Sequence, residues 1–211
     1  MEPTPRTQIH RKPARGSYDR DVVHRILDDG LVAHVGFEID RQPYVIPMAY
    51  ARMGDQLVVH GAAASRMLKH GAKRVPMCAT VTIIDGLVLA RSWFHHSMNY
   101  RSVVVLGAGR ELVEREEKLR ALAALIDHAL PGRVRESRPP NEKELAATRV
   151  IAIPIEEASA KCRTGGPLPD EDDDRALTWW AGEVPLAMCA RAAVPAVPGQ
   201  SLPASLVRWL R

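Results

Sequence analysis

The chain has 211 residues, 46% hydrophobic and 26% charged, which suits an ordinary globular domain with a large core. Its net charge is +4, but the basic residues are scattered and an acidic run lies at 170–174, so the pattern speaks against a nucleic-acid-binding protein. Three widely spaced cysteines argue against a disulfide framework or a metal site, and no apolar run could cross a membrane. We therefore expect a cytoplasmic protein without metal and without a membrane or nucleic-acid partner.

The N-terminal residues 1–16 are rich in Pro, Arg and Lys and show no periodicity, so we predict an arm that is mobile unless a partner fixes it. Apolar residues then recur at helical spacing, with Asp19 as the predicted N-cap and Gly30 as the predicted stop. The main domain is expected at 17–190. The remaining residues, 191–211, form an Ala-, Pro- and Val-rich tail.

Alternating apolar and polar residues predict several short strands. We expect them at 31–39, 44–50, 56–60, 76–84, 87–90, 100–107 and 149–155, with the last continuing toward 161. Asp85-Gly86 predicts a hairpin turn between the fourth and fifth strands. Pro47 cannot donate to a ladder, so the second strand should be an edge, bulged, or lack a neighbour there.

Helices are fewer than strands and do not alternate with them. The longest is predicted at 112–130, and Asn141 with Glu144 predicts a capping box for a short helix. Residues 164–175 should form a loop. Together the elements favour an antiparallel barrel or sandwich with helices outside, and no Rossmann or Walker fingerprint is present.

Three stretches carry side chains suited to an anion. Ser65 and Arg66 follow a small-residue loop where a helix should begin, which would offer free N–H groups, a hydroxyl and a guanidinium. Arg101, between Tyr100 and Ser102, precedes a run of valines. Lys161-Cys162-Arg163 places two cations on one face of an extended chain.

Each of these residues also has a purely structural interpretation. Ser65 could serve only as an N-cap, Arg101 could lie on a barrel rim, and the two cations at 161 and 163 could protect an edge strand. His60 could be a hydrogen-bonded core histidine. The adjacent His95 and His96 lack a third metal ligand at diagnostic spacing, so a surface or interface loop is expected there.

Taken together, the segments resemble the FMN-binding split-barrel family related to pyridoxamine 5′-phosphate oxidase, in the flavin-nucleotide-binding branch with nitroimidazole-resistance proteins. The segments that carry the resemblance are 43–47, 60–66, 97–103, 161–163 and 180–182. The resemblance implies a mainly β fold, a six-stranded antiparallel split β-barrel with peripheral α-helices. It also implies a homodimer with FMN at the subunit interface.

The resemblance also implies which residues bind the cofactor. They are Pro47, Met48, His60, Gly61, Ser65, Arg66, Tyr100, Arg101, Ser102, Lys161, Arg163 and Trp180. His60 is also the candidate catalytic residue. Two departures speak against pyridoxamine phosphate oxidation: Met67 stands where the oxidase has a lysine, and no Arg-x-His-x-Arg-like motif is found near 180–182.

The function that the resemblance implies is an FMN-dependent oxidoreductase that reduces a small organic acceptor, with nitro-aromatic compounds as one class. A non-enzymatic flavin-binding or flavin-buffering protein is the first alternative. The second is a split barrel that binds haem or a deazaflavin, with His60 or the His95-His96 loop serving a haem.

Overall fold

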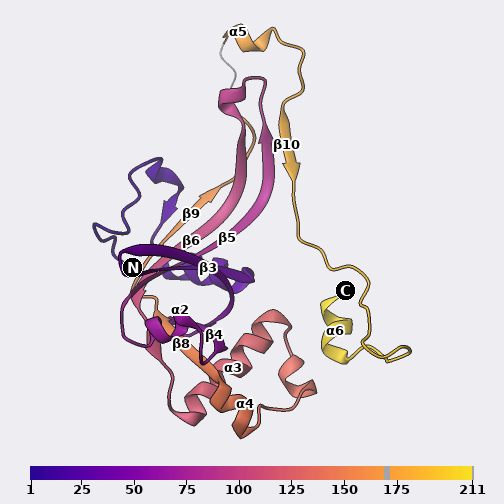
Figure 1. Cartoon of the computed structure of the whole chain (residues 1–211). Helices are drawn as coiled ribbons and strands as arrows, with labels where there is room; N and C mark the ends of the chain where they lie inside the picture. The colour runs from indigo at the N-terminus through magenta and orange to yellow at the C-terminus, as the bar shows by residue number, and fades with distance from the viewer. Residues whose placement is uncertain (169–171, 211) are drawn as a thin grey trace.

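The computed structural model describes residues 1–168 and 172–210, which form a curled antiparallel sheet with helices outside it (Figure 1). The strands are β1 (Gly16–Ser17), β2 (Val32–Ile39), β3 (Gln42–Met53), β4 (Gln56–Ala62), β5 (Pro76–Leu89), β6 (Ser97–Ala108), β7 (Arg110–Glu111), β8 (Thr148–Pro154), β9 (Glu157–Arg163) and β10 (Gly182–Pro185). The helices are α1 (Arg20–Asp29), α2 (Arg66–Gly71), α3 (Arg115–Ala129), α4 (Glu142–Ala147), α5 (Asp172–Arg175) and α6 (Ala204–Trp209), with short 3₁₀ turns η1 (Pro13–Arg15), η2 (Trp93–His95) and η3 (Arg133–Glu136).

The sheet follows the order β1-β9-β6-β5-β2-β3-β4-β8-β7, with β10 beside β5. It curls without closing, and β6 meets β8 where a side chain on Gly107 would lie 2.8 Å from the carbonyl oxygen of Pro154. The predicted mainly β split barrel is therefore confirmed. The sheet has more strands than the six-stranded barrel that the resemblance implies, partly because it includes the short strands β1, β7 and β10, of two to four residues.

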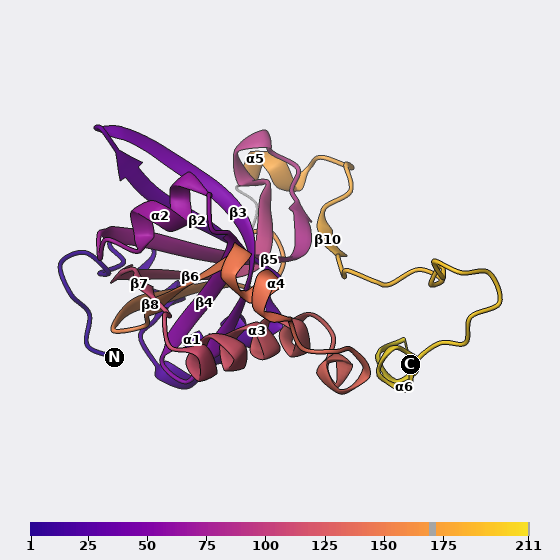
Figure 2. The ribbon, with the colours of Figure 1, turned by 60° about the horizontal axis from the view of Figure 1, so that its bottom comes forward.

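Two apolar clusters hold the sheet and helices together. Inward-facing residues such as Val35, Leu57 and Val103 fill the barrel. A second, smaller cluster joins the opposite face of β4 and β8 to Ala121 and Leu125 of α3, which lies along that side of the sheet (Figure 2). Alternation along the strands produces both clusters, because successive side chains point to opposite faces.

Helix α1 begins and ends where predicted. The Asp19 carboxylate accepts hydrogen bonds from the backbone N–H groups of Asp21 and Val22, and these bonds lower its pKa. The helix ends at Gly30, where any side chain would clash with Val81. Glycine is thus required there by close packing rather than by a left-handed backbone.

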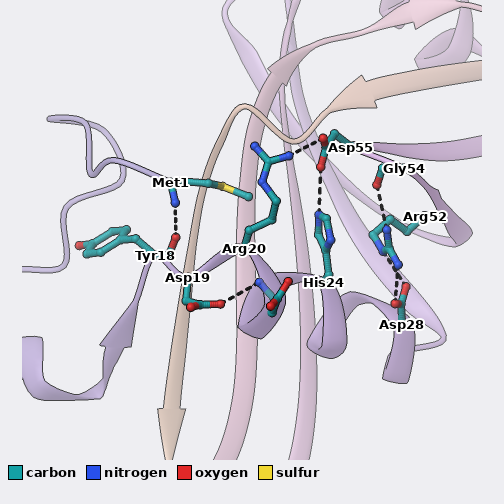
Figure 3. Close-up of polar contacts among 10 residues, drawn as sticks. Met1, Tyr18, Asp19, Arg20, His24, Asp28, Arg52, Gly54 and Asp55 are labelled. Atoms are coloured by element: carbon teal, nitrogen blue, oxygen red, sulfur yellow. Dashed lines mark hydrogen bonds and ion pairs between the residues drawn. The ribbon is translucent and has the colours of Figure 1, made fainter.

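Polar contacts fasten α1 to the turn between β3 and β4. Figure 3 shows Arg20 and His24 converging on Asp55, with His24 Nε2 3.2 Å from Asp55 Oδ1. One turn further on, Asp28 accepts from Arg52 at 2.6 Å. The helix is therefore held against the barrel by charge pairs as well as by its buried face.

The predicted hairpin at Asp85-Gly86 is wrong. β5 runs through both residues with a bulge between Ile84 and Gly86, and the turn to β6 falls at η2. Gly86 is needed because β10 lies so close that a Cβ there would be 3.0 Å from the carbonyl oxygen of Val184. The result is a long β5–β6 ribbon that extends well beyond the barrel, with β10 alongside (Figure 1).

The expected continuation of the last strand to 161 is also wrong. β8 pairs with β4 and β7, whereas β9 pairs with β6 and β1, near the other end of the sheet. The chain leaves the first ladder at Pro154, and the backbone N–H of Ile155 donates instead to the backbone carbonyl of Asp55. This crossing brings the two cations of β9 beside β6.

The N-terminal arm is held by contacts within its own chain. The Met1 amine donates to the Tyr18 carbonyl at 2.6 Å, as Figure 3 also shows, and the Ile9 N–H donates to the Tyr18 hydroxyl at 2.7 Å. The Thr4 hydroxyl donates to Glu157 of β9 at 2.8 Å. The arm therefore lies along the outer edge of β9.

The predictions for the capping box, the loop at 164–175 and the C-terminal tail have different outcomes. The capping box of Asn141 and Glu144 is confirmed. The predicted loop at 164–175 contains α5, and its residues 169–171 lie outside the described part of the chain. The tail extends away from the barrel until α6 docks through Ser205, whose N–H donates to Glu136 (Figure 2). None of the described helices is long and apolar enough to cross a membrane.

Candidate cofactor site

Strand register gathers four of the predicted site residues on one face of the sheet. Ser102 lies opposite Lys161 and Tyr100 lies opposite Arg163 where β6 pairs with β9. Val103 and its partner Ala160, the next row along, are fully buried in the barrel core, so by alternation the rows of Ser102 and Tyr100 face outward. The crossing from β8 to β9 thus joins segments about 60 residues apart in the chain into one surface.

A cavity of about 560 Å³ lies over this surface, and we call it the basic cleft. Its lining residues are Arg11, Lys12, Arg15, Phe94, His95, His96, Ser97, Tyr100, Lys161, Arg163 and Leu168. Five of them are Lys or Arg and none is a carboxylate. Cations that share a cleft without a lining carboxylate repel one another, and an anionic ligand relieves that repulsion.

Arg163 is the most buried of these cations, with 5% of its surface exposed. Its Nη atoms donate to the side-chain oxygen of Asn99 and to the carbonyls of Gly165 and Gly166, the last two at 2.7 and 2.8 Å. Within the described residues its Nε is buried without a hydrogen-bond partner. A buried guanidinium with neutral partners keeps its full charge available to an anion.

The N-terminal arm forms the second wall of the basic cleft. Lys161 Nζ donates to the backbone carbonyl of Arg11 at 2.9 Å, and β1 pairs with β9 through Gly16 and Lys161. Lys12 adopts a left-handed backbone with φ 53°, which turns the chain into η1 at Pro13. This turn places the side chains of Arg11, Lys12 and Arg15 along the cleft.

Sequence reasoning missed these three arm residues because residues 1–16 carry no periodicity. The available signal was local: three cations fall within five residues around Pro13. Such a cluster of cations indicates anion binding only when the surface that the arm packs against is also known. The partner surface is β9, and the pairing cannot be read from the arm itself.

A second, shallower hollow of about 430 Å³ adjoins the basic cleft, and we call it the apolar floor. Its lining residues are Thr82, Ile84, Ser97, Met98, Tyr100 and Ser102. Ile84 and Met98 are 40% and 50% exposed, a notable apolar surface for a sheet face. Ser97 and Tyr100 line both hollows, so the charged and apolar parts are continuous.

Arg101 lies away from the basic cleft and is engaged by carboxylates. Its guanidinium pairs with Asp85 at 3.0 Å and also with Asp29 at the end of α1. The hydrogen bonds to Asp85, followed by those to Asp29, raise its pKa despite partial burial. These two partners oppose the predicted contact with a cofactor phosphate, because they already neutralise the side chain.

Ser65 and Arg66 also lie apart from the basic cleft, because α2 packs against β4 and β8. Ser65 occupies the N-cap position without a side-chain hydrogen bond to the helix. The Arg66 guanidinium carbon lies 4.3 Å from the centre of the Tyr44 ring, a cation–π contact. The residues predicted to contact the phosphate therefore lie in three separate places on one chain: the basic cleft, Arg101, and the start of α2.

His60 and Gly61 lie on β4, beside β8. The His60 Nδ1 is buried and has no hydrogen-bond partner within the described residues, and burial lowers the pKa of the ring. A neutral imidazole is therefore favoured at this position at neutral pH.

Three further predicted contacts lie elsewhere. Pro47 faces no described strand on its second side, because β4 pairs with β3 only from Tyr50 onward; of the three predicted alternatives, edge, bulge or missing neighbour, the structure shows the last. Met48 packs against the barrel core. Trp180 is 61% exposed just before β10. No group of three or more His, Cys, Asp or Glu suited to a metal ion occurs in the part of the chain that the structure describes.

Comparisons with known proteins agree with this architecture. The model of the family described as pyridoxamine 5′-phosphate oxidase matches residues 19–162. The flavocytochrome Anf3 from Azotobacter vinelandii is 35% identical, covers 98% of this chain and 97% of its own, and superposes with a TM-score of 0.89. An FAD and heme binding protein from Mycobacterium smegmatis is 37% identical over 93% of this chain and 97% of its own, with a TM-score of 0.85.

A more distant structure shares only the fold. An FAD-binding protein from Mesorhizobium loti is 20% identical, covers 71% of this chain and 98% of its own, and has a TM-score of 0.51. The comparison with curated proteins found no match.

Proposed function

Because the chain belongs to the pyridoxamine 5′-phosphate oxidase family, we propose that it is a flavin-binding redox protein with its cofactor site on the outer face of β6 and β9. The observation that carries this proposal is the continuity of the basic cleft with the apolar floor. A flavin nucleotide has the matching halves, an anionic phosphate and a flat apolar ring. The names of the two relatives that cover most of the chain, a flavocytochrome and an FAD and heme binding protein, support it.

The residues of this chain would bind and orient the cofactor. Lys161 and Arg163 present cations from a rigid strand, and Tyr100 lines both hollows where the ring and phosphate would meet. FMN is the smallest cofactor with both parts. When bound, the flavin supplies the electron transfer, and the protein supplies position and electrostatics.

We propose a flavin-dependent oxidoreductase with a small organic electron acceptor, nitro-aromatic compounds being one class to test. A flavin carrier without catalytic activity is the alternative. Pyridoxamine phosphate oxidation is not proposed, because Met67, which stands at the position of the oxidase lysine, is 2% exposed within the barrel core. A side chain in that position does not reach a phosphate.

Haem is a second candidate cofactor, and His96 gives the specific observation. Its Nδ1 lies 2.9 Å from the carbonyl oxygen of Ser92, and it lines the basic cleft. Metal-binding histidines commonly use the other ring nitrogen for such a bond, which orients the ring. The names of both long relatives, which refer to a cytochrome or to heme, support this candidate.

We also propose that the protein forms a homodimer with the cofactor between subunits. The predicted contacts on β4 and α2 lie apart from the basic cleft of the same chain, so a second copy could supply them. Trp93 and Phe94 at the tip of the β5–β6 ribbon are 95% and 88% exposed, and Val45 on β3 is 65% exposed. Large apolar side chains at such exposure are typical of interfaces.

Absorbance of the purified protein tests the cofactor proposals. Flavin bands that persist through gel filtration support flavin binding, and a Soret band that is lost in a His96→Ala variant supports haem. A colourless protein that ignores added FMN, FAD and haemin would remove both. Reduction by NADH or NADPH, followed by turnover of a nitro-aromatic acceptor, separates the enzyme from the carrier. Light scattering during dilution tests the dimer, since release of cofactor with dissociation is expected.

A further inference from the structure

We propose that the C-terminal residues 187–202, which we call the strap, pack across a second copy of this chain and hold the two copies together. The surface that receives the strap is the segment 42–49 of β3 on the other copy. This inference rests on the homodimer of the proposed function, because it names the segments that join its subunits. In a two-fold dimer each copy gives one strap and receives the other.

The strap has the composition of a covered segment rather than that of a solvated linker. Ten of its sixteen residues are Ala, Val, Leu, Met or Cys, and Arg191 is its only charged residue. Segments that remain in solvent are typically polar and charged. Here Met188 and Val194 are 88% and 92% exposed, and Ala193 is the only strap residue that is partly buried. An apolar run with this exposure is typical of a protein–protein interface.

Both ends of the strap are fixed to the rest of the chain. Before it, β10 pairs with β5, and the Leu186 N–H donates to a β5 carbonyl at 2.9 Å. After it, Ser205 of α6 is fully buried, and its N–H donates to the Glu136 carboxylate at 3.0 Å. A helix as short as α6 is stable only when it is docked. Among the described residues, the strap itself makes one backbone–backbone hydrogen bond, from Gln200 to Val197.

The strap is long enough to cross a second copy. Figures 1 and 2 both show it standing clear of the barrel between β10 and α6. An extended segment of this length reaches about 50 Å, and a domain of this size is about 40 Å across. The second half of the strap borders a cavity of about 450 Å³ beside η3, with Leu130 and Leu202 in its lining. Space for the side chains of a partner is therefore present beside the strap.

The segment 42–49 of β3 offers a matching surface. Among the described strands it pairs with β2 alone, because β4 joins β3 only from Tyr50 onward. It carries no charged residue, and Val45 is 65% exposed. An uncharged strap can cover this uncharged edge without the cost of burying a charge. The prolines of both segments lack N–H donors, so we expect side-chain packing rather than an added strand.

A second copy satisfies both surfaces at once, because the same chain carries the strap and the edge that receives it. The strap also continues the interface proposed above, since β10 pairs with the ribbon whose tip exposes Trp93 and Phe94. Two aromatic side chains bury at most about 500 Å², whereas a stable interface needs roughly 800 Å² from each partner. The ribbon tip therefore needs a further segment, and the strap supplies it.

One charge in each segment tests the contact. Val194→Asp alters the strap and Val45→Asp alters the receiving edge, and we expect each to raise the dissociation constant of the dimer about tenfold or more. Analytical ultracentrifugation of the full chain measures this, and far-ultraviolet circular dichroism confirms folding. Val113→Asp is the matched control, because Val113 is exposed and lies outside both segments, so the dimer should keep its affinity.

Mixing the two variants separates a contact between copies from a contact within one copy. The Val194→Asp chain keeps an intact β3 edge and the Val45→Asp chain keeps an intact strap, so their heterodimer retains one undamaged contact. We expect the mixture to dimerise about tenfold more tightly than either variant alone. A mixture that shows no recovery would overturn the inference, as would a Val194→Asp dimer as tight as that of the wild type.

The wild-type chain gives a second reading if a variant fails to fold. Cys189 lies in the strap and is exposed in the single chain. Its reaction with N-ethylmaleimide, mapped by mass spectrometry, should be slower in the dimer than in the diluted monomer, and equal rates would contradict the strap. A dimer that ignores the strap leaves the homodimer proposal standing, whereas a wild-type protein that is monomeric at every concentration removes both. Absorbance reports flavin binding separately in either case.

Discussion

Lys161 Nζ donates a hydrogen bond to the backbone carbonyl of Arg11 across 150 residues of sequence, at 2.9 Å. This contact joins the outer strand of the sheet to the N-terminal arm and makes both part of one cleft. It also means that Lys161 has a structural partner as well as a place in the candidate site. The predictions below separate these roles from one another.

Loss of the Lys161 amine should weaken flavin binding. Lys161→Met keeps the length of the side chain but removes a charge-assisted contact of about 1.5–3 kcal/mol, so the Kd should rise about tenfold or more. Fluorescence titration measures this, with Lys73→Met, at an exposed lysine that does not line the basic cleft, as control. Equal affinity in Lys161→Met and wild type would exclude the amine from phosphate binding.

Arg101 should matter for stability and not for the cofactor. Its side chain is 34% exposed and pairs with Asp85 and Asp29. Allowing for solvent screening at that exposure, Arg101→Met should lower the free energy of unfolding by about 1–2 kcal/mol. Urea denaturation measures the loss, and a double-mutant cycle with Asp85→Asn isolates the pair. A large drop in flavin affinity with unchanged stability would restore Arg101 to the binding site.

The seam of the barrel should be sensitive at Gly107. A Cβ there would lie 2.8 Å from the carbonyl oxygen of Pro154, so Gly107→Ala forces β6 and β8 apart. We expect a loss of about 1–3 kcal/mol in unfolding free energy. Gly36→Ala is the matched control, because its Cβ would make only ordinary contacts at 3.6 Å or more. Thermal unfolding of both variants measures the loss. Equal melting temperatures for Gly107→Ala and Gly36→Ala would show that β6 and β8 are not closely packed at this seam.

Acid should loosen the N-terminal arm around Thr4 and Arg6, where Glu157 holds it. The side-chain hydrogen bond from Arg6, and then that from Thr4, lower the pKa of Glu157 below its ordinary value. A lowered pKa in the folded state means that the contact stabilises the arm above the unfolded-state pKa and is lost as pH falls through the folded-state value. Amide NMR signals of Thr7 and Gln8, whose N–H groups donate to the Thr4 carbonyl, report this transition below about pH 4.

The matched variants for that measurement lie side by side. Glu157→Gln should show a loosened arm at every pH, because the charged partner is gone. Glu156→Gln, at the neighbouring position outside the Arg6 pair, should titrate like the wild type. An arm that stays ordered down to pH 2 in the wild-type protein would show that Glu157 is not what holds it.

Part of the site could be predicted from the residues alone. The spacing of Lys161 and Arg163 in a strand predicts that they share one face, because alternation along a strand is a local property. The resemblance implies that Tyr100 and Ser102 contact the cofactor. That Tyr100 and Ser102 lie beside these two cations could not be predicted, since it depends on β9 pairing with β6. Nor could the surroundings of Arg66, which lies over Tyr44, or of Arg101, which pairs with Asp29 and Asp85, because these partners come from distant segments.

The amino-acid sequence by itself determined the elements that a few adjacent residues control: the alternating strands, the Asp19 cap, the capping box at Asn141, and with them a mainly antiparallel β fold, barrel or sandwich. Tertiary structure alone decided that β5 continues through Asp85-Gly86, that the chain crosses from β8 to β9, and that the arm brings Arg11 to Lys161. The physical reason is the distance along the chain over which each feature is set. Caps and alternation are set by neighbouring backbone groups, whereas strand partners and a shared cleft are set by packing between segments that the sequence keeps far apart.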